Sequence, residues 1–281
     1  MKLFVFLLLP HLSLSEVGQN FNKCNQFFLS NSPPQFTPAL SSSAHICQCL
    51  WDNNDKPIYL YATLYNTAWR IPIYSAYVLK SPHMGRCDAW FIEPQLDSIN
   101  EPCMRAEGPN NGNNQAVNSD YEKSNYDKGH LYPVQHTNNH LSMLATSTLT
   151  NAAPQDLTFN RGQWSKHETA VILDLQSCDE AYVVTGVVPD TNKGIPISKP
   201  TNNPRVTVSK YYWRATCCKK GPTFIGKGYF GPDNNGKVQS LPITGPTGLQ
   251  QKLINDYQVK DIIIFPVLPP GHKRPLTDVC N

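Results

Sequence analysis

The sequence has few charged residues and, after its N-terminal segment, no long hydrophobic stretch. These two absences exclude an intrinsically disordered chain and a chain with a membrane-spanning helix. After the N-terminal segment, no stretch approaches the roughly 20 apolar residues that cross a membrane as a helix, so we expect no membrane span. The composition is 16% charged and 40% hydrophobic over 281 residues. This balance is not that of a disordered chain, because it supplies enough apolar surface to offset the entropy lost on folding.

Several functional motifs and patterns are also missing. The sequence has no Gly-rich phosphate loop and no Gly-x-Ser-x-Gly motif, so a nucleotide-binding kinase and a serine hydrolase have no motif support. It contains no repeat with a period of about 20 to 50 residues. The formal net charge of +3 is too small to demonstrate a polyanion-binding surface by itself. One continuous domain is the simplest interpretation, and the sequence leaves the partner class and the oligomeric state open.

The first 20 residues, "MKLFVFLLLPHLSLSEVGQN", have the pattern of a secretory signal peptide. Lys2 precedes a short apolar run, and small residues stand at positions 13 and 15 before Glu16. We predict a signal peptide over residues 1–15, cleaved after Ser15, and a secreted, extracellular protein. The alternative is a buried N-terminal strand or helix.

The nine cysteines suit an oxidising compartment, where they form disulfides more readily than metal clusters. The pairs Cys47-Gln-Cys49 and Cys217-Cys218 lack the spacing of a zinc site. The connectivity is not readable from the sequence. Because nine is odd, one thiol is either free or paired with another chain.

The distribution of β-branched, aromatic and turn-forming residues predicts a mixed α+β fold with a mainly antiparallel sheet and helices. A Pro- and Ser-rich stretch over residues 16–55 is expected to be an extended N-terminal segment, followed by one domain over residues 56–281. The expected strands cover residues 57–63, 70–79, 180–190, 205–218 and 261–268. The expected helices run from 154 or 155 to 173 and over 247–259.

The stretch "YDKGHLYPVQ", residues 126–135, places an acid, a base, a glycine and a histidine in four consecutive positions. Taken alone, His130 is more simply a structural histidine. Downstream, "LTNAAPQDLTFNRGQWSKHE" covers residues 149–168, and a helix would place Asn160 and Glu168 only about 80° apart on one face. An amide oxygen and a carboxylate facing one cleft are ligands that suit Mg²⁺. The alternative is an amphipathic helix with a solvated polar face.

These two motifs, at this spacing, resemble the DNA/RNA non-specific endonucleases, which are ββα-metal or His-Me finger nucleases. The resemblance is strongest over residues 126–168 and extends more loosely over most of residues 55–270. It implies a ββα-metal nuclease core within the α+β fold. Either motif alone would be a weaker signal.

The resemblance also implies roles for individual residues. His130 matches the general base, Asn160 the direct metal ligand, and Glu168 the acidic residue that holds metal-bound water. Arg86 is the match for an upstream arginine that stabilises phosphate, and Arg70 is the less favoured choice.

Further polar residues are expected to bind substrate or to support the site: Asp127, Lys128, Asn151, Gln155 and Arg161. Lys128 departs from the family pattern, which usually has Arg at this position. Lysine cannot make the planar bidentate fork of arginine, so a role in clamping phosphate could be weakened.

The resemblance implies a secreted endonuclease that hydrolyses phosphodiester bonds in DNA and RNA with one Mg²⁺ or Mn²⁺ ion per site. Histidine, with an ordinary pKa near 6.5, can accept a proton from water near neutral pH. Recognition through phosphates would carry no base information, so both nucleic acids could enter without sequence preference.

Three alternatives remain at this point. One is a catalytically silent secreted protein that keeps the nuclease fold to bind nucleic acid or another protein. Another is a disulfide-stabilised extracellular module with no metal dependence. A zinc cluster of His130 with His136, His140 and His167 is a third, although their spacing matches no standard zinc motif.

Overall fold

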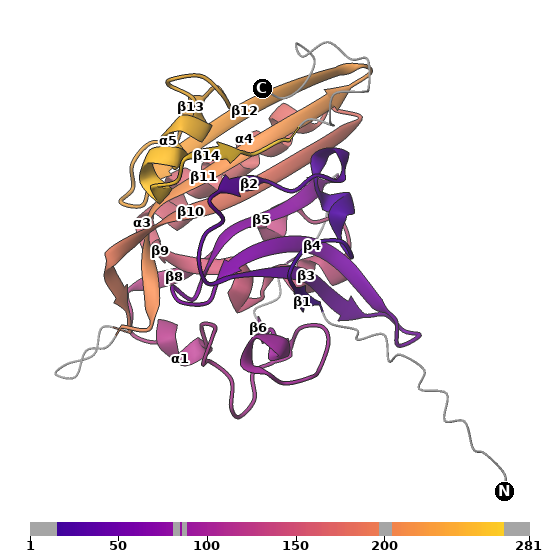
Figure 1. Cartoon of the computed structure of the whole chain (residues 1–281), viewed down its shortest axis with the longest axis vertical. Coiled ribbons are helices and arrows are strands. Elements are labelled where there is room, and N and C mark those ends of the chain that lie inside the picture. The colour runs from indigo at the N-terminus through magenta and orange to yellow at the C-terminus, as the bar shows by residue number, and fades with distance from the viewer. Residues whose placement is uncertain (1–15, 81–84, 86–88, 197–203, 267–281) are drawn as a thin grey trace, which may run out of the picture.

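The computed structural model describes residues 16–80, 85, 89–196 and 204–266, and its centre is an eight-stranded antiparallel sheet (Figure 1). The strand order is β1-β3-β4-β5-β10-β11-β12-β13. Their bounds are β1 Val17–Gly18, β3 Ser43–Trp51, β4 Pro57–Asn66, β5 Ile71–Leu79, β10 Glu180–Ile195, β11 Val206–Lys220, β12 Thr223–Pro232 and β13 Gln239–Leu241.

Smaller elements surround this sheet. Three two-stranded sheets pair β2 Gln35–Thr37 with β14 Asp261–Ile263, β6 Phe91–Ile92 with β7 Arg105–Ala106, and β8 Tyr126–His130 with β9 Ala152–Asp156. The α-helices are α1 Asn118–Tyr121, α2 His140–Thr146, α3 Leu157–Phe159, α4 Ser165–Leu175 and α5 Leu249–Tyr257, with a π-helical turn at Asn160–Trp164. Short 3₁₀ turns occur at Asn25–Phe27, Leu29–Asn31, Pro94–Asp97, Val134–His136 and Leu149–Asn151.

Both faces of the central sheet are covered. Trp213 and Ala215 of β11 pack into the same cluster as α5, whereas their neighbour Tyr212 packs with the helix-side residue Trp164. This alternation follows from the period of two in a strand, which sends successive side chains to opposite faces. Figure 1 accordingly shows α5, β14 and β2 on one side of the sheet and α4 on the other.

Most of the expected strands are confirmed. Strands β4 and β5 form the predicted hairpin, and β10 and β11 form a long antiparallel ribbon over the two later segments. The predicted C-terminal helix corresponds to α5, and the following strand is the short β14, which pairs with β2. None of the described helices is long and apolar enough to cross a membrane.

The segment 16–55 differs from the expected extended lead-in. Its strands β1 and β3 belong to the central sheet, and β3 pairs along its length with β4. The expected boundary at residues 55 and 56 therefore falls in the turn between two paired strands. Hydrophobic residues of β3 such as Ile46 and Cys47 are buried, which explains why this segment folds with the rest. The predicted signal peptide, residues 1–15, lies outside the described residues.

Disulfides form as expected. Three bridges join Cys24 to Cys47, Cys49 to Cys103, and Cys178 to Cys218. Cys217 is disulfide-bonded as well. Two further cysteines, at positions 87 and 280, lie outside the described residues.

The predicted helix starting at residue 154 or 155 begins later than expected. Pro154 and Gln155 belong to β9, where they pair with Lys128 and Asp127 of β8. Asp156 then starts the helix, because its side chain accepts hydrogen bonds from two backbone N–H groups of α3. The chain continues through the π-helical turn into α4, so β8, β9 and this helix together form a ββα unit.

Candidate active site

A cleft of about 810 Å³ opens beside the ββα unit. Its walls come from β8, from α1, from the residue before β6 and from the helix that follows β9. Six of the residues singled out in the sequence line this cleft: Asp127, Lys128, His130, Asn160, Arg161 and Glu168. The fold therefore brings together the two sequence motifs that suggested a site.

The β8–β9 pairing determines where His130 lies. His130 is the last residue of β8 and pairs with Ala152 of β9. One position earlier, Gly129 lies so close to its neighbours that a Cβ atom would be 2.3 Å from Gln155 Oε1 and 2.6 Å from Tyr212 Oη. Only glycine fits at that position, so the glycine before the histidine is a packing requirement of the strand pair.

Asp127 links β8 to the helix through three hydrogen bonds. Its Oδ2 accepts from Asn160 Nδ2 and Arg161 Nε, both at 2.9 Å, and its Oδ1 accepts from Arg161 Nη2 at 2.8 Å. A carboxylate can only accept, so it takes the amide NH₂ of Asn160 and leaves the Asn160 carbonyl oxygen for another partner. This orientation makes the carbonyl oxygen the group that Asn160 can offer to a cation.

Glu168 lies in the first turn of α4 at the buried end of the cleft. Its Oε2 accepts a hydrogen bond from Gln135 Nε2 at 2.8 Å, and its Oε1 lies 3.6 Å from Arg214 Nη2. Burial raises the pKa of Glu168, and the positive charge of Arg214 opposes that rise. The arginine thus favours the ionised form of the Glu168 carboxyl group.

Arg214 is a buried neighbour of Glu168 that the sequence motifs did not indicate. It is fully buried in β11, donates from Nε to Thr185 Oγ1 at 2.9 Å, and stacks over the Trp164 ring at 4.8 Å. The sequence feature that could have drawn attention to Arg214 is its charge within the otherwise apolar strand "YYWRATCC". A buried charge needs a partner, and the partner is Glu168.

An aromatic wall faces His130. The Trp90 ring lies 4.9 Å from the His130 ring, centroid to centroid, and the Lys128 ammonium lies over Trp90 at 4.9 Å and over Tyr121 at 5.8 Å. Lys128 Nζ also donates to Asn118 Oδ1 at 2.6 Å. Burial lowers the pKa of Lys128. The lysine that replaces the expected arginine is therefore held by ring faces and an amide, contacts that the sequence did not indicate.

The remaining predicted residues lie elsewhere. Asn151 and Gln155 are fully buried and do not line the cleft, so support of the site is the one of their two expected roles that agrees with their positions. Asn151 holds the segment after His130, because its side chain accepts from Tyr132 N and donates to Tyr132 O. Arg70 donates to the backbone oxygens of Asn113 and Arg205, away from the cleft. Arg86 lies outside the described residues.

The other histidines do not gather into a zinc cluster within the described part of the chain. His136 bonds to Tyr77 Oη at 2.8 Å and to the Glu168 backbone oxygen at 3.0 Å, and His167 packs between Trp164 and Tyr229. Burial lowers the pKa of His136 to about 3 and that of His167 to about 2. Both are neutral structural histidines.

Comparison with known families agrees with this geometry. A family model described as DNA/RNA non-specific endonuclease matches residues 50–244, which is more than half of the chain. The chain belongs to the DNA/RNA non-specific endonuclease family. The family predicted from the two motifs is thus confirmed, and nucleases of the DNA/RNA non-specific endonuclease family generally depend on a divalent metal ion.

Individual relatives give the same result. The endonuclease domain-containing 1 proteins of human and mouse are each 31% identical to this chain, over 219 and 214 residues. These regions cover 73% and 70% of this chain but 40% and 39% of the relatives, so the chain spans about two fifths of the curated relatives it matches. The crystal structure of an EndoG/EndoGI complex is similar with a TM-score of 0.54 at 17% identity, over 79% of this chain and 86% of that chain. That likeness confirms the α+β nuclease fold.

Proposed function

We propose that this chain is a secreted, Mg²⁺-dependent endonuclease that hydrolyses phosphodiester bonds in DNA and RNA. The observation that carries the proposal is the convergence of His130, Asn160 and Glu168 on one cleft of a ββα unit. The disulfides are consistent with an extracellular protein.

The donor set fits a single hard cation. Asn160 would bind Mg²⁺ or Mn²⁺ through the carbonyl oxygen that Asp127 leaves available, and Glu168 would hold water molecules of the ion. When bound, the ion would stabilise the charge that develops on the phosphoryl group and the leaving 3′ oxygen. A neutral amide ligand leaves most of the ion's charge unneutralised, so the affinity without substrate should be low.

His130 would act as the general base. The nucleophile is a water molecule that loses a proton as it attacks phosphorus, and His130 lines the same cleft as the proposed metal ligands. The Trp90 ring restricts the orientation of the imidazole from one side. Asn151 and the β8–β9 pairing position the strand end that carries it.

Phosphate contacts would bring either nucleic acid into the cleft without reading its bases. Lys128 and Arg161 supply positive charge at the cleft, although Arg161 is already paired with Asp127. Arg86 remains our proposal for a further phosphate contact.

The test is digestion of plasmid DNA and of RNA by the chain starting at residue 16, with Mg²⁺ or with EDTA. We expect cleavage that needs the metal and that falls about 10²–10⁴-fold in His130→Ala, the usual contribution of a general base. The matched control is His140→Ala, since His140 is exposed and outside the cleft. Asn160→Ala should lose most activity and regain part of it at high Mg²⁺.

Lack of cleavage by correctly folded wild-type protein would overturn the enzyme assignment. In that case, retained binding of nucleic acid would support the silent binding protein instead. Equal cleavage by wild type and His130→Ala would show that another group is the base.

A further inference from the structure

A second polar cluster lies away from the cleft and is not used by the proposed reaction. Four side chains meet there from four separate segments: Glu16, Gln48, Glu93 and Thr150. Each is at most 2% exposed. The burial of two carboxyl groups in one place requires an explanation, because an uncompensated buried charge costs several kcal/mol.

The contacts in this cluster leave several oxygens without donors. Gln48 Nε2 donates to Thr150 Oγ1 at 2.8 Å, and the Glu93 carboxyl lies against Glu16, Gln48 and Thr150. Four buried oxygens have no hydrogen-bond partner among the described residues, namely Glu16 Oε1, Gln48 Oε1 and both carboxyl oxygens of Glu93. All four are acceptors that belong to Glu93 or to a residue that contacts it.

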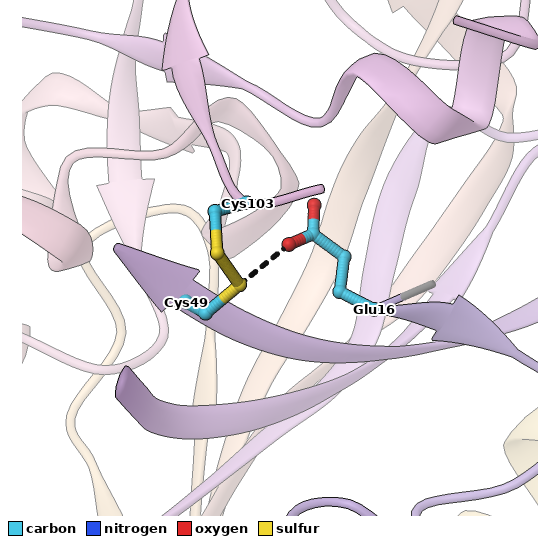
Figure 2. A group of neighbouring side chains, drawn as sticks. All are labelled: Glu16, Cys49 and Cys103. Atoms are coloured by element: carbon cyan, nitrogen blue, oxygen red, sulfur yellow. Dashed lines mark hydrogen bonds between the residues drawn. A yellow bond between two sulfur atoms is a disulfide. The ribbon is translucent and has the colours of Figure 1, made fainter. Parts of the chain in front are cut away.

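The nearby sulfur atoms do not supply a donor. Figure 2 shows Glu16 Oε2 directed at Cys49 Sγ, which it approaches to 2.7 Å. Cys49 is bonded to Cys103, so its sulfur carries no proton. Disulfide sulfurs are also not the thiolates that bind zinc. The available ligands are therefore oxygens.

Protons or a cation could satisfy this cluster. Burial and the neighbouring carboxyl group raise the pKa of Glu16 to about 12, burial raises the pKa of Glu93, and Lys23 opposes the rise at Glu16 more weakly. Protonation of both carboxyl groups would supply two O–H donors, which could serve the other carboxyl group and the Gln48 amide oxygen. A divalent cation would instead balance both carboxylates and take these oxygens as ligands.

We propose that Glu16, Gln48, Glu93 and Thr150 form a buried Ca²⁺ site. The ligands are hard oxygens from two carboxylates, one amide and one hydroxyl, which is the chemistry that Ca²⁺ prefers. Mg²⁺ fits less well because it retains several waters, and these side chains are buried. The ion joins the N-terminal segment to β3, to the 3₁₀ turn before β9 and to the residue that follows β6.

This site would support the cleft from a distance. Glu93 follows β6 directly, and Trp90, which contacts His130, precedes β6 directly. Thr150 precedes Asn151, which holds the segment after His130. The bound ion is therefore a structural link between the N-terminal segment and two supports of the candidate active site.

A buried Ca²⁺ site has two properties that can be measured. Because the ligands are buried, Ca²⁺ is taken up as the chain folds and exchanges slowly. Because a metal ion binds deprotonated carboxylates, uptake should strengthen as the pH rises. An acid pair that only shares a proton has neither property.

The experiment measures metal content and thermal unfolding after refolding of the chain from residue 16 in Ca²⁺ or in EDTA. Wild type should retain one Ca²⁺ per chain after desalting and unfold roughly 3–6 °C higher with Ca²⁺. Glu93→Gln and Glu16→Gln should lose both the ion and the shift. The matched control Glu101→Gln removes an exposed carboxylate shortly after Glu93 and should behave as wild type.

Asn160→Ala separates this site from the proposed catalytic metal, because it should retain the Ca²⁺ and the shift. A folded wild type with no bound Ca²⁺ and no shift would overturn the proposal and leave a proton-sharing acid pair. Loss of Ca²⁺ in Asn160→Ala alone would assign the ion to the cleft. If Glu93→Gln does not fold, the behaviour of Glu16→Gln and the metal content of wild type decide whether the site binds Ca²⁺. None of these outcomes depends on nuclease activity.

Discussion

At the scale of single residues, Asp127 decides what its neighbours can do. It accepts from the Asn160 amide and pairs with Arg161, so it orients a proposed metal ligand and neutralises a cation that we expected to contact substrate. Arg214 acts similarly on Glu168 by favouring its ionised form. In both cases a partner on a strand, Asp127 of β8 or Arg214 of β11, acts on a cleft residue of the helical segment.

Lys128 gives a first prediction at this scale. Lys128→Arg should leave kcat/KM on plasmid DNA unchanged or raise it, because arginine keeps the charge, stacks on aromatic rings and adds bidentate phosphate contact. Lys128→Gln, which loses the charge, should reduce it. A large loss in Lys128→Arg would show that the contacts with Asn118 and the two rings need an ammonium group.

His136 gives a second prediction, on pH. Burial lowers its pKa to about 3, so His136 is neutral in the fold while the unfolded chain binds a proton below about pH 6.5. The stability that His136 contributes is therefore present above about pH 6.5 and falls by about 1.4 kcal/mol per pH unit as the pH drops towards the folded pKa.

The measurement compares urea unfolding of wild type and His136→Asn between pH 4 and 7. The difference in unfolding free energy should shrink with falling pH. Burial raises the pKa of Asp233 to about 7, which has the opposite sign, but this effect is common to both proteins and cancels. A pH-independent difference would contradict a neutral buried His136.

At the scale of elements, the β8–β9 pair and the following helix form the frame of the candidate site. The pair places Asp127 and His130 on one strand, and Asp156 ends the partner strand by capping α3. The π-helical turn then carries Asn160 into α4, whose first turn carries Glu168. π-Helical turns often occur at functional sites, and this one lies at the proposed metal ligand.

Gly129→Ala tests this frame. The added Cβ would meet Gln155 and Tyr212, and Tyr212 is fully buried and bonded to the Ala153 backbone oxygen at 3.0 Å. We expect a loss of about 1–3 kcal/mol in unfolding free energy, typical of overpacking, with a larger loss of cleavage. Gly162→Ala is the control, because its Cβ would have no contact closer than 3.6 Å. Equal stability of both variants would contradict the tight packing beneath β8.

At the scale of the whole molecule, the central sheet and the disulfides hold the two sides of the cleft together. The bridge between Cys178 and Cys218 joins the segment that follows α4 to β11. Helix α4 carries Glu168, and β11 carries its partner Arg214. The N-terminal segment is integrated through β1, β3 and the bridge between Cys24 and Cys47. Parts that are distant in sequence therefore determine one site.

Removal of that bridge gives the prediction at this scale. The double variant Cys178→Ser, Cys218→Ser should lose about 2–5 kcal/mol of unfolding free energy, measured by urea denaturation, because the bridge no longer restricts the unfolded chain. In conditions where the variant is folded, cleavage should persist, since β10 and β11 still place Arg214 beside Glu168. Unchanged stability would show that the bridge constrains little of the chain.

The sequence by itself determined the family, the α+β class and the main strands. It also pointed to His130, Asn160 and Glu168, which line one cleft and remain proposed site residues. These features depend on local patterns: period-two alternation gives the strands, and two short motifs carry the proposed chemistry. It misplaced the start of the helix because Pro154 and Gln155 read locally as a helix start. In the structure their backbone pairs with β8.

Only the tertiary structure decided which partners surround the site. Arg214, Trp90 and the buried group around Glu93 lie far from the two motifs along the chain, and no local pattern links them to His130 or Glu168. Tertiary packing also buries Asn151 and Gln155, which leaves them the expected supporting role rather than direct contact with substrate. The physical reason is that burial, charge pairing and ring contact depend on distances in space, which the pairing of strands distant in sequence creates.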